Sequence, residues 1–360
     1  MEVFDCGTKI ISGAGAVSHL AQFRAKRLFL VTDPFFYQNG TAQRVAAESK
    51  AEQVQIFHEI RPDPTVELAA EGTAKLKDFQ PDLIVALGGG STMDCAKAMT
   101  YFAQPEAKLV AIPTTSGSGS EVTDFAILTH NKVKHPLVDR RLRPHTAILD
   151  SDLLIELPAS LIADTGFDVL THAVEAFVAK DAGTFSDMLA QEAFRSAYGA
   201  LPASYAGRQN VRLKVHQAAT MAGLAFTQAG LGLCHAMAHS LGGMFHVPHG
   251  QLNAVLLPAV IASNAHVAAP KYAQLSRACG MGSTTDTIAV RNLRSNLVRL
   301  RRELKLPETL VQAGIAPGAL RSAMNDVVSA TLADPCCKSN PMKVEDFLVR
   351  RILEEVTGRV

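Results

Sequence analysis

The stretch LCHAMAHSLGGMFHVPHG, residues 233–250, contains four of the chain's twelve histidines. His235 and His239 are four residues apart, so a helix places them on the same face. His249 follows a proline and precedes a glycine, which is typical of a turn into the next element. Neutral imidazole is the commonest side-chain ligand of divalent metals. The stretch therefore indicates either a metal site or a set of core histidines on an apolar helix.

A second stretch, GFDVLTHAVE at residues 166–175, favours the metal site. Asp168 and His172 are also four residues apart, and their mostly apolar neighbours predict a buried helix. A carboxylate in a core is costly unless it is paired or bound to a metal. One carboxylate and three imidazoles suit a first-row divalent ion with an open position for substrate. The candidate ligands are Asp168, His172, His235 and His249.

The first half of the chain alternates short apolar runs with helical patterns. Nearly continuous apolar strands separated by helices are typical of a parallel sheet covered on both faces. The predicted strands are 27–32, 54–60, 83–87 and 109–113. From about Ile155 such runs nearly vanish, and helical periodicity follows, for example over 185–206, 211–228, 286–304 and 344–356. We predict a Rossmann-like, dinucleotide-binding α/β domain over residues 1–155 and an all-α domain over residues 156–360.

Composition excludes several classes of partner. The formal net charge of +1 gives no electrostatic case for binding nucleic acid or an acidic membrane surface. No apolar run approaches the length of a membrane span. Residues 1–5 lack the basic and apolar regions of a signal peptide, and the six cysteines include no CxxC pair. We expect a cytoplasmic protein with reduced thiols and with neither nucleic acid nor membrane as a partner.

The sequence GGGS at residues 88–91 lies between a predicted strand and a predicted helix. A turn of this kind lets a phosphate approach backbone amides at a helix N-terminus. It is neither GxGxxG nor a Walker A motif, so a tight structural turn stays open as an alternative. Asp94 either caps this helix or contacts a cofactor, and Lys97 either reaches a phosphate or is solvated.

Two further segments at predicted strand ends suit a cofactor. Residues 114–121, TTSGSGSE, are dense in hydroxyls and glycine, so they either line a cofactor or form a flexible loop. Asp33 follows the strand at 27–32. It is either a turn-forming residue before Pro34 or an acceptor for an adenosine ribose, where a carboxylate repels a 2′-phosphate. If a dinucleotide binds, Asp33 favours NAD over NADP.

Together these motifs resemble the iron-containing, or group III, alcohol dehydrogenases over nearly the whole chain. The matching stretches are GGGSTMDCAKA (88–98), IPTTSGSGSEVT (112–123), TGFDVLTHAVEAF (165–177) and GLCHAMAHSLGGMFHVPHGQLNAVLLP (232–258). The resemblance implies an α/β dinucleotide-binding domain followed by a helical domain, an architecture that dehydroquinate synthase shares. It also implies a metal-dependent, NAD(H)-linked enzyme that interconverts short primary alcohols and aldehydes.

The resemblance assigns a role to each candidate residue. The metal ligands would be Asp168, His172, His235 and His249, with Fe(II) the usual ion and Zn the alternative. His239 would lie beside the substrate and assist proton transfer. The residues implied to bind NAD are Asp33, Asp63, Gly89, Gly90, Ser91, Asp94, Thr114, Thr115, Ser118, Thr123 and Lys134. Asp63 stands where many relatives have Asn.

Within the family, four stretches are similar to the 1-propanol dehydrogenases of bacterial microcompartments: PDPT (62–65), KHPL (134–137), FTQAGLGL (226–233) and HVPHG (246–250). The ethanolamine-pathway alcohol dehydrogenases are the near alternative. This similarity implies reduction of propanal or acetaldehyde with regeneration of NAD, and a homodimer or higher homo-oligomer. It also implies residence in the cytoplasm, with a microcompartment and its shell proteins as a further option. A glycerol or diol dehydrogenase, a maleylacetate reductase, a metal-dependent hydrolase and a non-catalytic scaffold stay open.

Overall fold

The computed structural model describes residues 3–130 and 133–358 of the chain. Contacts divide the chain into two compact units, Asp5–Leu157 and Pro158–Val360, and the second also includes the N-terminal segment that ends at Phe4. The domain boundary predicted from the sequence lies between residues 155 and 156. Each unit has its own core and carries its own group of candidate residues.

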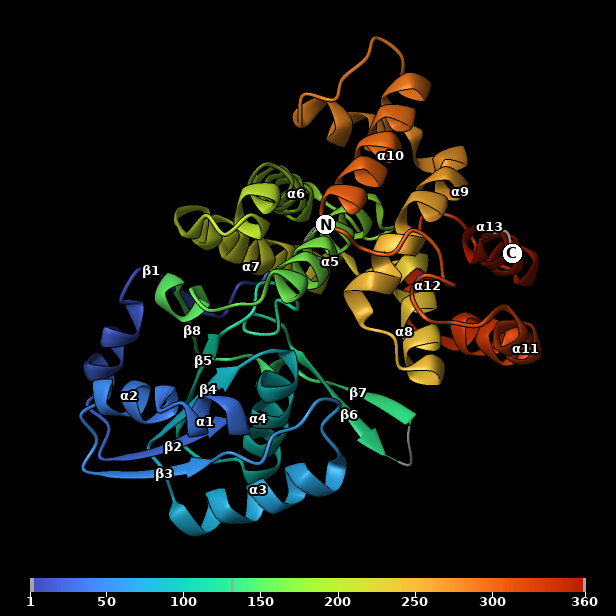
Figure 1. Cartoon of the computed structure of the whole chain (residues 1–360). Helices are drawn as coiled ribbons and strands as arrows, with labels where there is room; N and C mark the ends of the chain where they lie inside the picture. The colour runs from blue at the N-terminus through green and yellow to red at the C-terminus, as the bar shows by residue number, and fades with distance from the viewer. Residues whose placement is uncertain (1–2, 131–132, 359–360) are drawn as a thin grey trace. The chain divides into compact units, whose positions relative to one another are not determined.

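A six-stranded parallel sheet forms the centre of the α/β unit (Figure 1). The strand order is β1-β8-β5-β4-β2-β3, and every neighbouring pair is parallel. The strands are β1 Lys9–Gly13, β2 Arg27–Thr32, β3 Gln53–Phe57, β4 Leu83–Gly88, β5 Lys108–Pro113 and β8 Thr146–Asp150. The predicted parallel α/β sheet is therefore confirmed. Strands β1 and β8 were not among the four predicted strands.

The sheet is apolar on both faces because both faces are covered. In β2, Phe29 and Val31 pack in the core that α3 (Val66–Phe79) and α4 (Gly90–Ala103) complete. Leu28 and Leu30 point to the opposite core, which contains residues of the 3₁₀ helix η1 (Ala16–Phe23) and of α2 (Thr41–Glu48). Successive strand residues point to opposite faces. This alternation explains why the strands read as nearly unbroken apolar runs.

The rest of the α/β unit consists of short elements. Strands β6 (Phe125–His130) and β7 (Val133–Val138) form a separate antiparallel pair. The remaining helical segments are α1 Pro34–Gln38, η2 Arg140–Leu142 and η3 Ser151–Leu154. Helix α1 follows β2 and helix α4 follows β4, each after one residue, so both helices begin at the carboxyl edge of the sheet.

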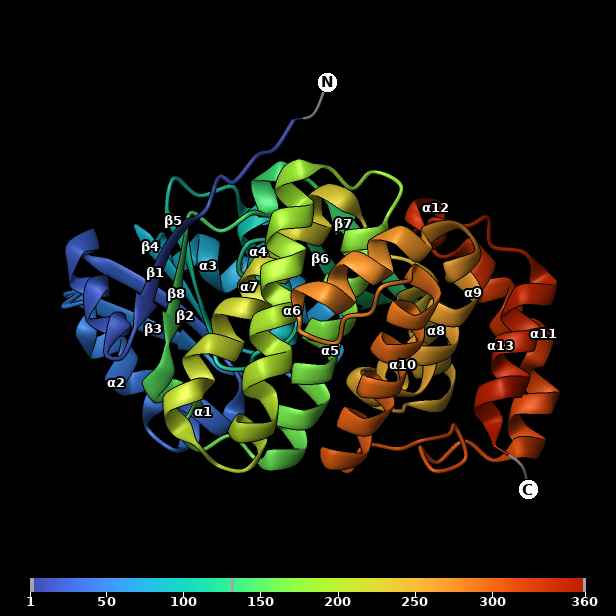
Figure 2. The same ribbon diagram turned by 90° about the horizontal axis from the view of Figure 1, so that it is seen from above.

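The second unit is helical within the residues described (Figure 2). Its helices are α5 Ala159–Val178, α6 Thr184–Tyr205, η4 Gln209–Val211, α7 Arg212–Ala229, α8 Leu233–Phe245, α9 His249–Ala278, α10 Asp286–Glu303, α11 Pro317–Ala333, α12 Cys336–Ser339 and α13 Asp346–Thr357. The four helices predicted here correspond to α6, α7, α10 and α13. Helix α5 packs against α6, α7 and α9, which places it in the middle of the unit.

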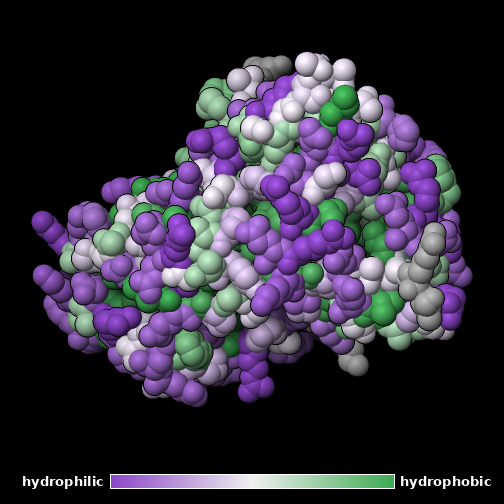
Figure 3. Space-filling view, turned by 45° about the horizontal axis from the view of Figure 1, so that its top comes forward, coloured by the Kyte–Doolittle hydropathy of each residue, from purple (hydrophilic) through white to green (hydrophobic). Residues whose placement is uncertain are grey.

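Helix α9 is long and apolar enough to cross a membrane by length and composition alone. However, 72% of its most apolar window is buried inside the protein, as in the core helix of a folded domain. On the face drawn in Figure 3, hydrophilic and apolar residues are interspersed. Helix α9 is therefore best explained as part of the core, where it packs against α5, α8 and α10.

Candidate functional site

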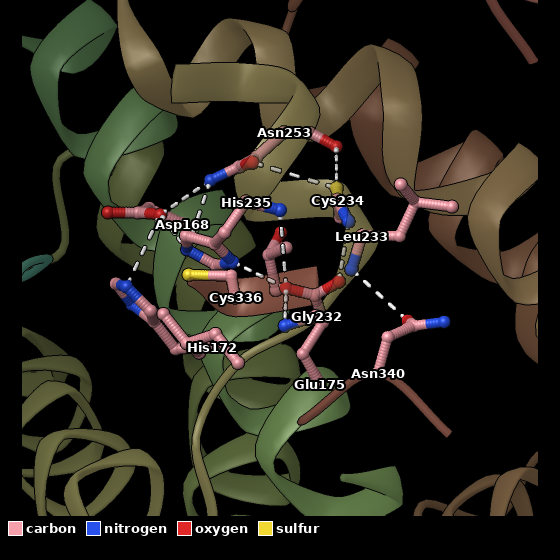
Figure 4. Close-up of polar contacts among 12 residues, drawn as sticks. Asp168, His172, Glu175, Gly232, Leu233, Cys234, His235, Asn253, Cys336 and Asn340 are labelled. Carbon is pink, nitrogen blue, oxygen red and sulfur yellow. Dashed lines mark hydrogen bonds and ion pairs between the residues drawn. The ribbon is translucent and has the colours of Figure 1, made fainter. Parts of the chain in front are cut away.

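Helix α5 supplies three polar side chains that point into the protein (Figure 4). Asp168, His172 and Glu175 are spaced by four and three residues, so they lie along one face of the helix. All three are buried, although most of their neighbours on α5 are apolar. Burial of such groups is costly unless they are paired or bound to an ion. This face of α5 therefore provides the first three polar side chains of the candidate site.

A tight connection between α8 and α9 brings His249 to α5. Helix α8 carries His235 and ends at His246, whose left-handed conformation (φ 56°) turns the chain toward the start of α9. Gly250 follows His249, and a Cβ at this position would lie only 1.9 Å from the backbone oxygen of Asp164 on α5. Only glycine permits this approach of the two helices. The close packing of α9 against α5 therefore explains the glycine of the Pro-His-Gly sequence.

Three imidazoles surround one carboxylate oxygen. The Nε2 atoms of His172, His235 and His249 lie 3.8, 3.5 and 3.6 Å from Asp168 Oδ1. These distances exceed those of good hydrogen bonds. Two ligands that are each about 2.0–2.1 Å from a tetrahedral ion are about 3.4 Å apart. The structure therefore brings the four predicted ligands together, and their spacing and donor types fit a divalent metal ion.

The charges in this cluster also call for a cation. Burial alone would raise the pKa of Asp168, but the charges of His172 and His249 and the contact with His235 outweigh burial and lower it. Burial alone would lower the pKa of His235, but hydrogen bonds with Asp168 and Glu175 raise it to about 9. His235 thus lies between two buried carboxylates. The two carboxylates favour positive charge here, which either the proton of His235 or a metal ion at its Nε2 supplies.

Glu175 was not identified from the sequence. Its carboxylate accepts hydrogen bonds from Nδ1 of His235 at 2.6 Å and from the backbone N–H groups of Gly232 at 3.0 Å and Cys234 at 2.6 Å. It thereby satisfies free amides at the N-terminus of α8 and orients a candidate ligand at the same time. The available signal was its position seven residues after Asp168, on the same face of α5.

Asn253 of α9 completes the support of the buried carboxylate. Its Nδ2 donates to Asp168 Oδ1 at 2.7 Å and lies 3.5 Å from His235 Nε2. The side chain is fully buried. Asn253 was not identified from the sequence, because an asparagine within an apolar helical run gives no specific signal of what it contacts.

His239 lies on α8 beside the candidate ligands but has a different partner. Its ring centroid is 6.0 Å from that of His235 and 5.3 Å from that of His249. Its Nδ1 lies 2.9 Å from Oδ2 of Asp334, the residue that ends α11. The His239 side chain is 32% exposed, whereas that of His235 is 1% exposed. The two histidines of the HxxxH pair are therefore in different environments.

In the α/β unit, the glycine turn leads directly into α4. Gly89 is the N-cap residue and no side chain caps the helix, so the first amides of α4 are not used by a capping side chain. A Cβ on Gly88 would lie 2.3 Å from Thr92 Oγ1, which explains one glycine by packing. Gly89, Gly90 and Ser91 thus lie at a helix N-terminus, where backbone amides and the helix dipole suit a phosphate.

The side chains of Asp94 and Lys97, both on α4, form hydrogen bonds with residues 120–127. Asp94 Oδ1 accepts from Ser120 Oγ at 2.7 Å, and its Oδ2 accepts from the backbone of Ile127 at 3.1 Å. The alternative that Asp94 caps α4 is wrong, since it is the fifth residue of that helix. Lys97 is 1% exposed, so the alternative that it is solvated is also wrong. Burial raises the pKa of Asp94 and lowers that of Lys97 to about 8.

The hydroxyl-rich segment lies against the glycine turn. A Cβ on Gly89 would be 3.3 Å from Thr115 Oγ1, and one on Gly90 would be 3.2 Å from Ser118 Oγ. Thr114, which follows β5, donates its backbone N–H to the oxygen of Gly88 at 3.0 Å. The structure therefore brings these predicted residues together at the carboxyl ends of β4 and β5. Thr123, the remaining predicted cofactor residue of this segment, instead accepts a hydrogen bond from Lys97 at 2.8 Å.

The other predicted cofactor residues already have protein partners. Asp33 Oδ1 accepts from the backbone N–H of Phe36 at 3.1 Å and so caps α1. Lys134 Nζ lies 2.7 Å from Asp63 Oδ1, and both side chains are exposed. The pair links β7 to the segment before α3. Their roles toward NAD stay predictions.

Comparisons with known proteins agree with this arrangement. The family profile "Iron-containing alcohol dehydrogenase" matches residues 7–151, and the profile "Fe-containing alcohol dehydrogenase family, C-terminal" matches residues 162–357. The "1-propanol dehydrogenase PduQ" of Salmonella typhimurium is 38% identical, with 99% of this chain and 100% of that protein covered. The "NADPH-dependent butanol dehydrogenase" of Clostridium saccharobutylicum is 34% identical, with 96% and 95% covered.

Solved structures show the same similarity. The iron-containing alcohol dehydrogenase from Thermococcus thioreducens superimposes with a TM-score of 0.91 at 32% identity and covers 98% of this chain and 99% of that one. A 1,3-propanediol oxidoreductase superimposes with a TM-score of 0.93 at 31% identity and covers 99% and 100%. Both the fold and the full-length sequence similarity lead to one assignment: the chain belongs to the iron-containing alcohol dehydrogenase family.

Proposed function

We propose that this enzyme is a metal-dependent, NAD(H)-linked alcohol dehydrogenase that interconverts short primary alcohols and aldehydes. In the proposed physiological direction it reduces propanal or acetaldehyde and regenerates NAD. The carrying observation is the convergence of three imidazole Nε2 atoms within 3.8 Å of Asp168 Oδ1. Relatives that are named propanol and butanol dehydrogenases support the substrate class.

Asp168, His172, His235 and His249 hold the divalent ion in this proposal, with Fe(II) the first choice and Zn the alternative. The ion supplies Lewis-acid polarisation of the substrate oxygen, and NAD(H) takes up or supplies the hydride. Asn253 and Glu175 hold the ligands in place from behind.

His239 moves the hydroxyl proton. Asp334 accepts from its Nδ1 and so leaves Nε2 to exchange a proton with the substrate oxygen. Its partial exposure supports proton exchange with water. His239 is therefore the proposed catalytic histidine, and Asp334 is its positioning residue.

The glycine turn and the hydroxyl-rich segment bind the dinucleotide. The amides of Gly89, Gly90 and Ser91 at the start of α4 receive the diphosphate. Asp33 at the end of β2 receives the adenosine ribose and selects NAD over NADP. The remaining proposed contacts are Asp63, Asp94, Thr114, Thr115, Ser118, Thr123 and Lys134.

The test is NADH oxidation by the purified protein with a panel of short aldehydes, together with metal analysis. We expect turnover of propanal and acetaldehyde that is lost when the metal is removed and returns with Fe(II). Full activity in metal-free protein would contradict the metal assignment. Turnover of an ester or amide with no change in NADH absorbance would favour a metal-dependent hydrolase instead.

We further propose that the enzyme is a homodimer or larger homo-oligomer in the cytoplasm, and that it is encapsulated in a bacterial microcompartment. The similarity to 1-propanol dehydrogenases named PduQ supports this setting. Sedimentation of the pure protein tests the oligomeric state. Co-purification with shell proteins tests encapsulation, and its absence from purified compartments would refute it.

A further inference from the structure

A second cluster of ligating side chains lies in the helical unit. It consists of His239 on α8, Asp334 at the end of α11 and Cys336 at the start of α12. A ring nitrogen, a carboxylate oxygen and a thiol sulfur from these residues all lie within 4.8 Å of one another. All three residues are partly exposed, so an ion from solvent can reach them. Cys336 also lies in the close-up of the first site (Figure 4).

The internal contacts of the cluster hold the three side chains in place. Asp334 Oδ2 is 2.9 Å from His239 Nδ1, and Asp334 Oδ1 accepts the backbone N–H of Cys336 at 2.8 Å. The carboxylate therefore links an imidazole on one helix to the residue that carries the thiol on another.

The donor set differs from that of the first site. Asp168 and its three histidines provide only oxygen and nitrogen, whereas the second cluster provides nitrogen, oxygen and sulfur. Thiolate ligands favour softer ions such as Zn²⁺ and Co²⁺, and three protein ligands plus water make a common tetrahedral site. The second cluster therefore differs from the first by its sulfur ligand, which marks an ion bound there.

We propose that His239, Asp334 and Cys336 form a second metal site that binds Zn²⁺ or Co²⁺ and thereby inhibits the enzyme. Binding releases the proton of the Cys336 thiol to solvent, the ion takes the place of the proton between His239 Nδ1 and Asp334, and the ring proton of His239 moves to Nε2. His239 is then fixed to the ion and no longer exchanges a proton. The inhibitory part rests on the proposed role of His239, whereas ion binding by the cluster does not.

Cobalt binding to the full-length protein tests the site directly. A thiolate bound to Co²⁺ gives a sulfur-to-metal charge-transfer band in the near ultraviolet, and the four ligands of the first site contain no sulfur. We expect two Co²⁺ per chain and this band in the wild type. Cys336→Ser should bind one Co²⁺ without the band.

Cys337→Ser is the matched control, because the adjacent Cys337 thiol instead donates to the backbone oxygen of Thr331 at 3.0 Å. This variant should keep both ions and the band. A wild type that binds one Co²⁺ without the band would overturn the proposal, as would a band that survives in Cys336→Ser.

Inhibition is then measured on the iron-loaded enzyme. The Zn²⁺ concentration for half-inhibition should rise by about tenfold or more in Cys336→Ser and stay unchanged in Cys337→Ser. Equal sensitivity of both variants would refute the inhibitory role. If no variant or wild type turns over aldehydes, the proposed function fails, while the cobalt stoichiometry and the band still decide the site.

Discussion

Glu175 Oε2 lies 2.6 Å from His235 Nδ1, and the same carboxylate accepts the backbone N–H groups of Gly232 and Cys234. His235 is therefore fixed through its ring and through the first turn of its helix. Because Nδ1 donates to Glu175, Nε2 is the nitrogen that faces Asp168. The choice of ligating nitrogen at the proposed metal centre is therefore set by a residue outside the proposed ligand set.

This relationship predicts the effect of Glu175→Gln. The change replaces one acceptor oxygen by an NH₂ group that opposes backbone N–H donors, and it removes the charge that holds His235 in place. We expect a folded protein whose metal affinity falls by about 10–100-fold, as for other residues behind metal ligands. Competition with a chelator measures this affinity. Glu192→Gln, at a carboxylate that pairs with the exposed Arg195, is the control. Unchanged affinity in Glu175→Gln would show that the carboxylate only caps α8.

His235 and His239 share one helix, four residues apart, so their alanine variants serve as controls for each other. His235→Ala should lose both metal and turnover, because a ligand is removed. His239→Ala should keep the iron of the first site while kcat falls by about 100-fold, the range for loss of a positioned acid–base group. Iron content by elemental analysis of the iron-loaded protein and steady-state kinetics on the same samples separate the two effects. Loss of iron from His239→Ala would mean that His239 is a ligand of the first site.

The sequence predicted the elements and residues that follow a regular spacing of apolar or polar side chains. Helices α6, α7, α10 and α13 and strands β2, β4 and β5 follow from regular apolar patterns. Among the candidate ligands, Asp168, His172 and His235 follow from i, i+4 spacing, and His249 follows from the turn between Pro248 and Gly250. Strands β1 and β8 are five residues each, and their pairing joins segments more than 130 residues apart. No local sequence pattern predicts a pairing between segments so far apart.

Supporting residues were harder to predict than ligands. Asp334 contacts His239 from the end of α11, 95 residues further along the chain. Lys97 is buried because three oxygens from residues 120–125 surround its amino group. A charged residue in a sequence is normally interpreted as solvated. Only the tertiary structure reveals the partners that compensate its burial.

One substitution separates the α1 cap that Asp33 provides from its proposed role toward NAD. Asp33→Asn keeps an oxygen that accepts from Phe36 and so preserves the cap of α1, but it removes the negative charge. We expect the ratio of kcat/KM for NADPH to that for NADH to rise by about tenfold, because a 2′-phosphate is no longer repelled. Asp78→Asn, at an exposed residue of α3, controls for net charge. An unchanged ratio would leave Asp33 with the cap alone.

Lys97 predicts a pH dependence of stability in the α/β unit. Its Nζ donates to Ser120 Oγ at 2.9 Å, Thr123 Oγ1 at 2.8 Å and the oxygen of Phe125 at 2.8 Å, but burial lowers its pKa from 10.5 to about 8. Between these two values the unfolded chain binds more protons than the folded one, so stability rises with pH across this window.

Lys97→Met removes this dependence together with the three hydrogen bonds. We therefore expect the wild type to gain stability over Lys97→Met as pH rises from about 8 to about 10.5, by an amount on the order of 3 kcal/mol. Urea unfolding at a series of pH values measures the difference, and Lys26→Met at an exposed residue controls for the loss of a surface charge. A wild-type advantage that stays constant or shrinks over this range would mean that Lys97 keeps its proton in the folded protein, and that the attraction of Asp94 outweighs the effect of burial on the pKa of Lys97.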